Sequence, residues 1–117
     1  DVTTELLEAA DSDIVRFFSL FSDDCIFRLG NNDIIRGREN IQAWVADYLG
    51  AVAGMRHEIV EMWSEGDVAA ARVEVTYTMN SGATFTLPAV TRTRVRDGRV
   101  SEYLTFMDPS PVVAASA

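Results

Sequence analysis

The sequence predicts an α+β fold in which a curved antiparallel sheet wraps around N-terminal helices and leaves a cone with an open end. Three observations predict this class. Apolar residues recur at helical spacing in the first half of the chain, an alternation with a period of two begins near residue 56, and three turn-forming segments divide the second half into hairpins. Helices followed by a meander are typical of a sheet with its helices gathered on one face. At 117 residues one core suffices, so we expect a single domain over residues 1–117.

Two helical regions are expected before the meander. In the first, apolar positions three and four residues apart are interrupted by Asp11-Ser12-Asp13, which predicts two short helices or one broken helix. Its apolar positions are Leu6, Leu7, Ala10, Ile14, Phe17, Phe18 and Phe21. The second helix extends from Gly37 to Leu49 and stops at Gly50. Its apolar positions are Ile41, Trp44, Val45, Tyr48 and Leu49.

Six strands are expected, of which the first two are short. They are residues 25–29, which stop at the turn formers of residues 30–33, and residues 34–36, which pair back. The long strands are expected at about 56–63, 68–79, 83–95 and 99–107, joined by hairpin turns at 64–67, 80–82 and 96–98. Pro88 has no amide proton, so we expect a bulge or a sheet edge there. Residues 109–117 are expected to be loose or draped over a neighbouring element.

Composition and charge exclude several classes of protein. The chain has 10 Lys and Arg against 18 Asp and Glu, a net charge of -8, and the basic residues form no cluster that would favour nucleic acid. No apolar run approaches the roughly 20 residues that span a bilayer, and no secretion signal opens the chain, so we expect a soluble cytoplasmic protein. Cys25 is the only cysteine and should be a small buried residue. With a single histidine as well, we expect neither a metal nor another cofactor.

Arg72 and Glu74 are the first candidate catalytic pair. Residues two apart on a strand share a face, so the two side chains can meet. In a pocket, the guanidinium would keep the carboxylate ionised as a base for a water or a carbon acid. The alternative is an ion pair on the wet face of the sheet. If the pair lines the pocket, the alternate set Val73, Val75, Tyr77 and Met79 faces outward, and an apolar outer face of that kind predicts a homodimer.

His57 is the third candidate catalytic residue. As the only histidine, it is the one side chain whose ordinary pKa lies near neutrality, so it can serve as base or hydrogen-bond donor. The alternative is a strand-end histidine paired with Glu58 or Glu61. Asp108, just before Pro109, is expected at the rim of the cone, either as a site residue or in turn chemistry.

An aromatic and apolar pocket wall is expected for a hydrophobic small-molecule ligand. Tyr103, Thr105 and Met107 share one face of the last strand, and the first two add hydrogen-bonding groups. The remaining candidate lining residues are Phe17, Phe21, Phe27, Trp44, Tyr48, Trp63 and Thr91. For the helical and strand aromatics, the alternative is ordinary core packing.

Four segments in order carry a family resemblance: Phe21-Ser-Asp-Asp24, Gly37-Arg-Glu-Asn-Ile41, Arg72-Val-Glu-Val-Thr-Tyr77, and Asp97-Gly-Arg-Val100 followed by residues 103–109. Together they resemble the nuclear transport factor 2-like superfamily, and more narrowly its SnoaL-like domains, relatives of polyketide cyclases, ketosteroid isomerase and limonene epoxide hydrolase. The resemblance covers nearly the whole chain. Because that superfamily contains both enzymes and binding proteins, it implies the fold more strongly than a reaction.

The positions that match known family sites depart from them. Ketosteroid isomerase-like enzymes use a carboxylate base after the first strand and a tyrosine with a protonated acid as an oxyanion hole. Those positions correspond here to Leu29, Glu5 and Thr91, which argues against that reaction. Limonene epoxide hydrolase-like enzymes place an Arg-x-Asp pair, a second Asp and a Tyr-x-Asn around a water. The resemblance puts Arg72 and Glu74 at the pair, Thr105 at the second Asp, and Phe27 and Leu29 at the Tyr and Asn.

Three functional hypotheses follow. The first is a small cofactor-independent enzyme, an isomerase, cyclase or epoxide-hydrolase-like protein, in which Glu74 is oriented by Arg72 and assisted by His57. The second is a non-catalytic small-molecule-binding or dimerisation module with the same fold. The third is a cone filled by its own side chains, which would leave a protein-interaction role. Convergence of Arg72, Glu74 and His57 on one cavity would favour the first.

Overall fold

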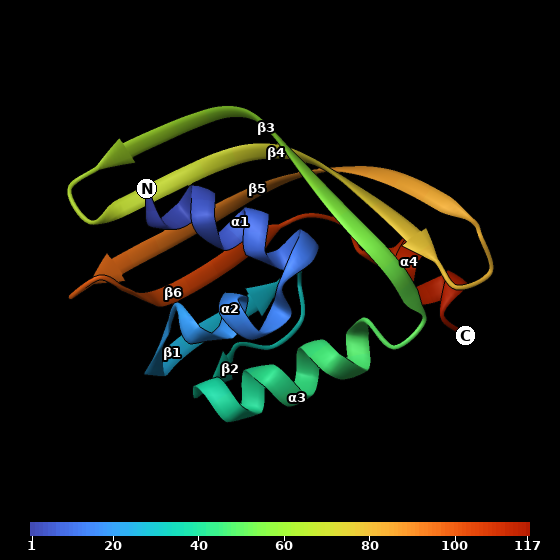
Figure 1. The fold of residues 1–117 in the computed structure, drawn as a ribbon, viewed down its shortest axis with the longest axis horizontal. Helices are drawn as coiled ribbons and strands as arrows, with labels where there is room; N and C mark the ends of the chain where they lie inside the picture. Colours follow the sequence, from blue (N-terminus) through green and yellow to red (C-terminus); the bar gives the residue numbers. More distant parts are fainter.

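A computed structural model describes residues 1–117 as a curved six-stranded sheet with helices on its concave side (Figure 1). The helices are α1 (Val2–Ser12), α2 (Ile14–Ser19), α3 (Arg38–Tyr48) and α4 (Ser110–Ala115). The strands are β1 (Phe21–Leu29), β2 (Ile35–Arg36), β3 (Val52–Glu65), β4 (Val68–Met79), β5 (Thr84–Arg96) and β6 (Arg99–Phe106). Their order is β2-β1-β6-β5-β4-β3, and only the β1–β6 pair is parallel. The predicted α+β class is therefore confirmed.

The first helical region is two helices separated at Asp13. The Asp1 side chain caps α1 by accepting hydrogen bonds from the amides of Thr3 and Thr4, and the Asp13 side chain caps α2 by accepting from the amide of Arg16. Asp is among the best N-cap residues because its side-chain oxygen accepts from otherwise unpaired amides of the first turn. The break turns the chain so that α1 and α2 both cover the sheet (Figure 1).

The register of β4 decides which side chains face the helices. Val73, Val75 and Tyr77 are buried on the concave face, whereas Arg72 is exposed on the convex face and Glu74 is only partly buried there. The expectation that the Arg72–Glu74 pair faces the cavity is therefore wrong. The apolar set was expected outside as a dimer face, and it forms part of the core instead. Burial of the larger apolar set outweighs any gain from enclosing an ion pair.

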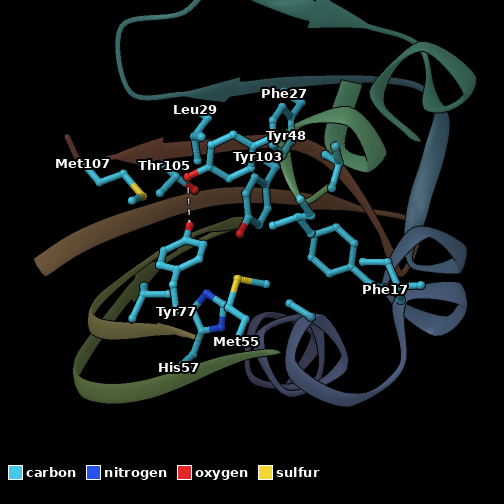
Figure 2. A pocket seen from close by; sticks show the side chains of 15 residues that line it. Phe17, Phe27, Leu29, Tyr48, Met55, His57, Tyr77, Tyr103, Thr105 and Met107 are labelled. Atoms are coloured by element: carbon cyan, nitrogen blue, oxygen red, sulfur yellow. Dashed lines mark hydrogen bonds between the residues drawn. The ribbon is translucent and has the colours of Figure 1, made fainter. Parts of the chain in front are cut away.

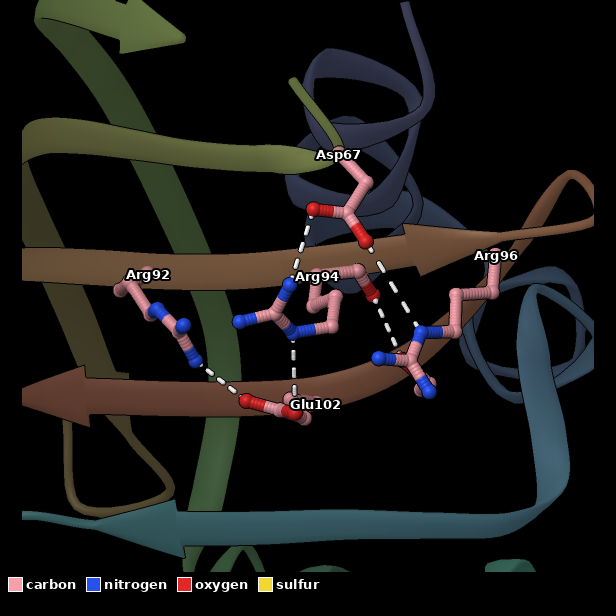
Figure 3. Close-up of polar contacts among 6 residues, drawn as sticks. Asp67, Arg92, Arg94, Arg96 and Glu102 are labelled. Atoms are coloured by element: carbon pink, nitrogen blue, oxygen red, sulfur yellow. Dashed lines mark hydrogen bonds and ion pairs between the residues drawn. The ribbon is translucent and has the colours of Figure 1, made fainter. Parts of the chain in front are cut away.

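The convex face carries ion pairs that bridge neighbouring strands. Arg94 on β5 donates to both Glu102 on β6 and Asp67 in the β3–β4 turn, at 3.0 and 2.8 Å, and Arg92 is paired with Glu102 as well (Figure 3). Hydrogen bonding by Arg92 holds the pKa of Glu102 below its usual range, and hydrogen bonding by Arg94 does the same for the pKa of Asp67. These charges are satisfied within the chain.

Three details differ from the sequence-based expectations or explain them. β1 and β3 begin earlier than expected, at Phe21 and Val52. Near its start each strand has a bulge that shifts the pairing register, and the strand continues through it. The C-terminal segment is not loose, since α4 places the side chain of Val112 fully in the core. Pro88 lies in β5 beyond the point where β6 pairing begins, at Val90, so its missing amide proton leaves no ladder bond unmade on that side.

None of the four helices has the length and apolar character that a membrane crossing requires.

Candidate functional site

An apolar pocket lies between the concave face of the sheet and helices α1, α2 and α3 (Figure 2). Its wall consists of Ala10, Ile14, Phe17, Phe27, Leu29, Val45, Tyr48, Leu49, Met55, His57, Val75, Tyr77, Tyr103, Thr105 and Met107. The free space inside is only about 50 Å³. A cavity of roughly 150 Å³ accommodates a benzene ring, so this space accepts a functional group rather than a large molecule.

His57 and Asp11 form a hydrogen-bonded pair in the wall of this pocket. One carboxylate oxygen of Asp11 lies 2.5 Å from His57 Nδ1, and the other accepts a 2.8 Å hydrogen bond from the His57 backbone amide. The side chains are only 8% and 20% exposed. A carboxylate can only accept hydrogen bonds, so in the neutral ring Nδ1 carries the proton and Nε2 has the lone pair. Asp11 thus fixes both the ring orientation and the tautomer.

The local sequence explains how this pair meets. Asp11 lies in the last turn of α1, just before the break, where the helix ends over β3. His57 pairs with Val75 on β4, which places its side chain on the concave face with Met55 and Tyr77. The pair therefore joins α1 to the edge strand β3. It also supplies the only titratable groups of the pocket region that are neither phenols nor thiols.

Three phenols share the pocket with His57. Tyr48 on α3 donates a 3.2 Å hydrogen bond to the phenol oxygen of Tyr77 on β4 (Figure 2). Tyr77 therefore still has its own proton to donate, since its oxygen is used as the acceptor. Tyr103 on β6 packs its ring parallel to Phe27 at 5.2 Å, and Figure 2 shows its hydroxyl directed toward the same space as His57 and Tyr77.

Burial keeps these phenols protonated. It raises the pKa of Tyr103 to about 12, and it raises the pKa of Tyr77 and of Tyr48 as well. A buried phenolate would lose its hydration without gaining a cation, because no Arg or Lys lines the pocket. At neutral pH these groups act as hydrogen-bond donors and not as bases. The only lone pair suited to accept a proton is that of His57 Nε2.

The structure places part of the sequence-predicted set in this pocket. The predicted residues in its wall are Phe17, Phe27, Tyr48, His57, Tyr103, Thr105 and Met107. The alternative interpretation of His57 paired it with Glu58 or Glu61. In the structure its partner is Asp11 instead. Thr105 lies beside Thr91, and their hydroxyls are 3.4 Å apart.

Seven other candidate residues lie elsewhere. Arg72 is paired with Glu61 at 2.7 Å on the convex face, and Glu74 lies on that face too. Trp63 is 51% exposed there, because it shares the outward parity of Arg72 across the β3 bulge. The rest belong to the core behind the pocket wall or pack against it: Phe21, Trp44 and Thr91. Asp108 is exposed after β6, where it accepts a hydrogen bond from the amide of Ser110, as its turn interpretation expected.

Sequence reasoning missed Asp11 and Tyr77. Asp11 was interpreted only as part of a helix break, and its partner lies 46 residues away, so no local spacing links them. Tyr77 was assigned outward together with Val73 and Val75. The length of that apolar alternation could have revealed the buried face. Five alternate residues of β4, from Ala71 to Met79, are buried.

No group of three or more His, Cys, Asp or Glu side chains is arranged to hold a metal ion. The arrangement described above can instead support proton transfer between Nε2 of His57 and a bound molecule whose oxygen is held by a phenol.

Comparison with known families and structures gives a consistent result for the fold. The family model described as "SnoaL-like domain" matches residues 4–103. No curated protein sequence matches the chain significantly.

Several solved structures are similar over nearly the whole chain. A protein of Jannaschia sp. CCS1, provisionally assigned as a SnoaL-like polyketide cyclase, superposes with a TM-score of 0.83 at 19% identity, covering 97% of this chain and 88% of that one. A Catenulispora acidiphila protein with a ketosteroid isomerase-like fold, in complex with trimethylamine, gives 0.83 at 19% identity, covering 97% and 90%. An LEH-like epoxide hydrolase of M. tuberculosis gives 0.80 at 15% identity, covering 97% and 84%. At these identities the likeness concerns the fold.

Proposed function

Because the chain belongs to the SnoaL-like domain family, whose model matches residues 4–103, we propose that it is a cofactor-independent enzyme that transfers a proton at carbon in an uncharged apolar carbonyl compound. Enolisation of this kind underlies both isomerase and cyclase reactions. The observation that carries the proposal is the Asp11–His57 pair inside a pocket lined by protonated phenols. In this proposal the Asp11–His57 pair has the catalytic role that was expected for Glu74 and Arg72, which lie on the other face of the sheet.

The chemistry requires one base and one donor at the same carbonyl group. His57 Nε2 removes a proton from the carbon next to the carbonyl, and Asp11 stabilises the imidazolium that forms. The oxygen of the carbonyl gains negative charge as the proton leaves. The phenol of Tyr77, whose oxygen already accepts from Tyr48, donates to it, and a donor fixed in an apolar site is worth far more than one in water. The imidazolium then returns the proton to carbon.

An epoxide-hydrolase-like reaction has less support. It calls for an acid and an arginine around a water, and the residues that resembled this pair, Arg72 and Glu74, are on the convex face. The likeness to an epoxide hydrolase is one of fold.

The test is exchange of α-hydrogens for deuterium in D₂O, followed by proton NMR on small methyl ketones. The wild-type protein should accelerate exchange, and His57→Gln should lose about a hundredfold or more, which is the usual contribution of general base catalysis. Glu74→Gln is the matched control, because it removes a carboxylate from the convex face and should leave the rate unchanged. Equal rates for wild-type protein and His57→Gln would contradict the proposal. A large loss of rate in Glu74→Gln would support Glu74 as the catalytic base, as expected from the sequence.

A second candidate function is non-catalytic binding of a small molecule. Its support is the small, ring-walled space without an arginine or lysine, and the presence of trimethylamine in the Catenulispora structure. Aromatic faces attract alkylammonium ions, so trimethylammonium is a suitable probe. Tight binding of this probe with no ketone exchange would favour storage over catalysis.

We also propose that two copies associate through the convex face of the sheet. Trp63 and Phe106 are 51% and 59% exposed on that face. Arg72, Arg92 and Arg94 on this face are paired with carboxylates within the chain, so opposite charges lie side by side there in a molecule of net charge -8, and repulsion between two copies is reduced. Sedimentation should show a dimer at micromolar concentration and a monomer for Trp63→Glu. A monomeric wild-type protein would contradict this assembly.

A further inference from the structure

A second, larger hollow adjoins the pocket. It is a groove of about 580 Å³ bounded by the end of α1, the start of α2, one side of α3 and the start of β3. Five residues line both spaces: Ala10, Ile14, Val45, Leu49 and Met55. The groove therefore adjoins the pocket along this shared wall.

The two spaces differ in size by an order of magnitude. The pocket beside His57 has about 50 Å³ and the groove about 580 Å³. A molecule that places a reactive group against His57 must therefore leave most of its bulk outside the pocket. The groove next to the pocket offers an apolar surface for that bulk, where Ile14, Leu49 and Val52 contribute to the lining.

The lining also restricts the charge of the occupant. Asp11 and Gln42 are the only polar side chains of the groove, and the Asp11 carboxylate is already engaged by His57. None of the ten Arg and Lys residues lines either space. A carboxylate or phosphate entering here would lose hydration without meeting a guanidinium or ammonium group. The site thus selects against acids.

We propose that the groove binds the extended apolar tail of an uncharged carbonyl compound whose reactive end enters the pocket. The proposal rests on the proposed function for the identity of the reactive end, and on the shared wall, size and charge of the two spaces for the tail. The substrate class is then a long-chain ketone, and short ketones occupy only the inner end of the site.

The test uses 2-alkanones of four to twelve carbons, with dissociation constants measured by tryptophan and tyrosine fluorescence. A fully buried methylene strengthens binding about fourfold, so an open groove should give roughly twofold or more per methylene across the series. Ala46→Glu places a charge on the α3 wall of the groove and should abolish the dependence on length while leaving 2-butanone binding unchanged. Ala43→Glu is the matched control, because Ala43 is an equally exposed alanine of α3 that lines neither space, and it should behave as wild type.

Ala53→Asp repeats the test from the β3 wall, in case Ala46→Glu fails to fold. Affinity that does not rise with chain length in the wild-type protein, or that rises equally in Ala46→Glu and Ala53→Asp, would overturn the groove assignment. Its failure is separable from that of the proposed function. Length-dependent binding without α-proton exchange would support the groove proposal and contradict the proposed enzymatic function. Exchange of short ketones without length-dependent binding would support the enzymatic function and contradict the groove proposal.

Discussion

Ionisation of the tyrosines by alkali reports directly on the pocket, because all three tyrosines of the chain lie in its wall. Burial raises the pKa of Tyr103 to about 12, and it raises the pKa of Tyr48 and Tyr77. An ordinary phenol near pKa 10 is about 90% ionised at pH 11, whereas Tyr103 should be only about 10% ionised. The folded protein should therefore show little tyrosinate absorbance at 295 nm at pH 11, and the unfolded chain nearly all of it.

The same shift makes stability depend on pH in a defined direction. Between the unfolded pKa near 10 and the folded pKa near 12, the folded state holds a proton on Tyr103 that the unfolded chain has lost. The contribution is complete below pH 10 and is lost as pH rises to 12, about 3 kcal/mol for Tyr103 at about 1.4 kcal/mol per pKa unit. Urea unfolding at pH 9 to 11 measures about half of this contribution, and Tyr103→Phe should lose less stability over that range.

A tyrosine that ionises near pH 10 in the folded protein would refute this reasoning. It would mean that the phenol reaches solvent, whereas the structure has Tyr77 and Tyr103 buried. Absorbance that rises together with loss of far-ultraviolet ellipticity would instead report unfolding, so both signals are followed in the same titration.

Three further predictions concern residues outside the proposed chemistry. Arg72→Ala should lower the free energy of unfolding by less than about 1 kcal/mol in urea titrations, because its pair with Glu61 is half exposed; a loss of several kcal/mol would contradict the convex-face assignment. Cys25 should resist aromatic disulfide reagents at pH 8 until the protein unfolds, since burial raises its thiol pKa to about 11, and rapid labelling of folded protein would count against its burial. Gly30→Ala should lower the melting temperature by several degrees, because Gly30 has φ +58° and an added Cβ would lie 2.8 Å from the Met107 carbonyl oxygen; an unchanged value would show that this backbone relaxes freely.

The fold could be predicted because each element carries its own periodicity. The local patterns include the helical spacing around Phe17 and Ile41 and the turns at residues 64–67 and 96–98. The folded structure has helices and turns at these same places. The face of β4 could not be fixed in the same way. A two-residue period gives two faces, and the resemblance to epoxide hydrolase-like enzymes favoured placing Arg72 and Glu74 inside. The greater apolar area of the alternate set decided the orientation the other way.

The candidate site was predictable only in part for a related reason. His57, Tyr103 and Thr105 could be selected because each is a rare or polar residue on a strand that must face a cavity. The partner of His57 could not, because its position depends on where α1 ends over β3, which is a property of packing and not of spacing. The convex exposure of Trp63 follows from the β3 bulge, and sequence alternation does not reveal a bulge.

The proposed chemistry depends on the pairing of Asp11 with His57, which nitrogen NMR of the imidazole ring can observe. Since His57 is the only histidine, a protein labelled with ¹⁵N-histidine gives one pair of ring signals. The structure predicts that the neutral ring carries its proton on Nδ1, and that a bound ketone shifts the Nε2 signal while Asp11→Asn changes the tautomer. A neutral ring protonated on Nε2 would rule out this pairing. An Nε2 signal that does not shift when a ketone binds would rule out the proposed contact between His57 and the substrate.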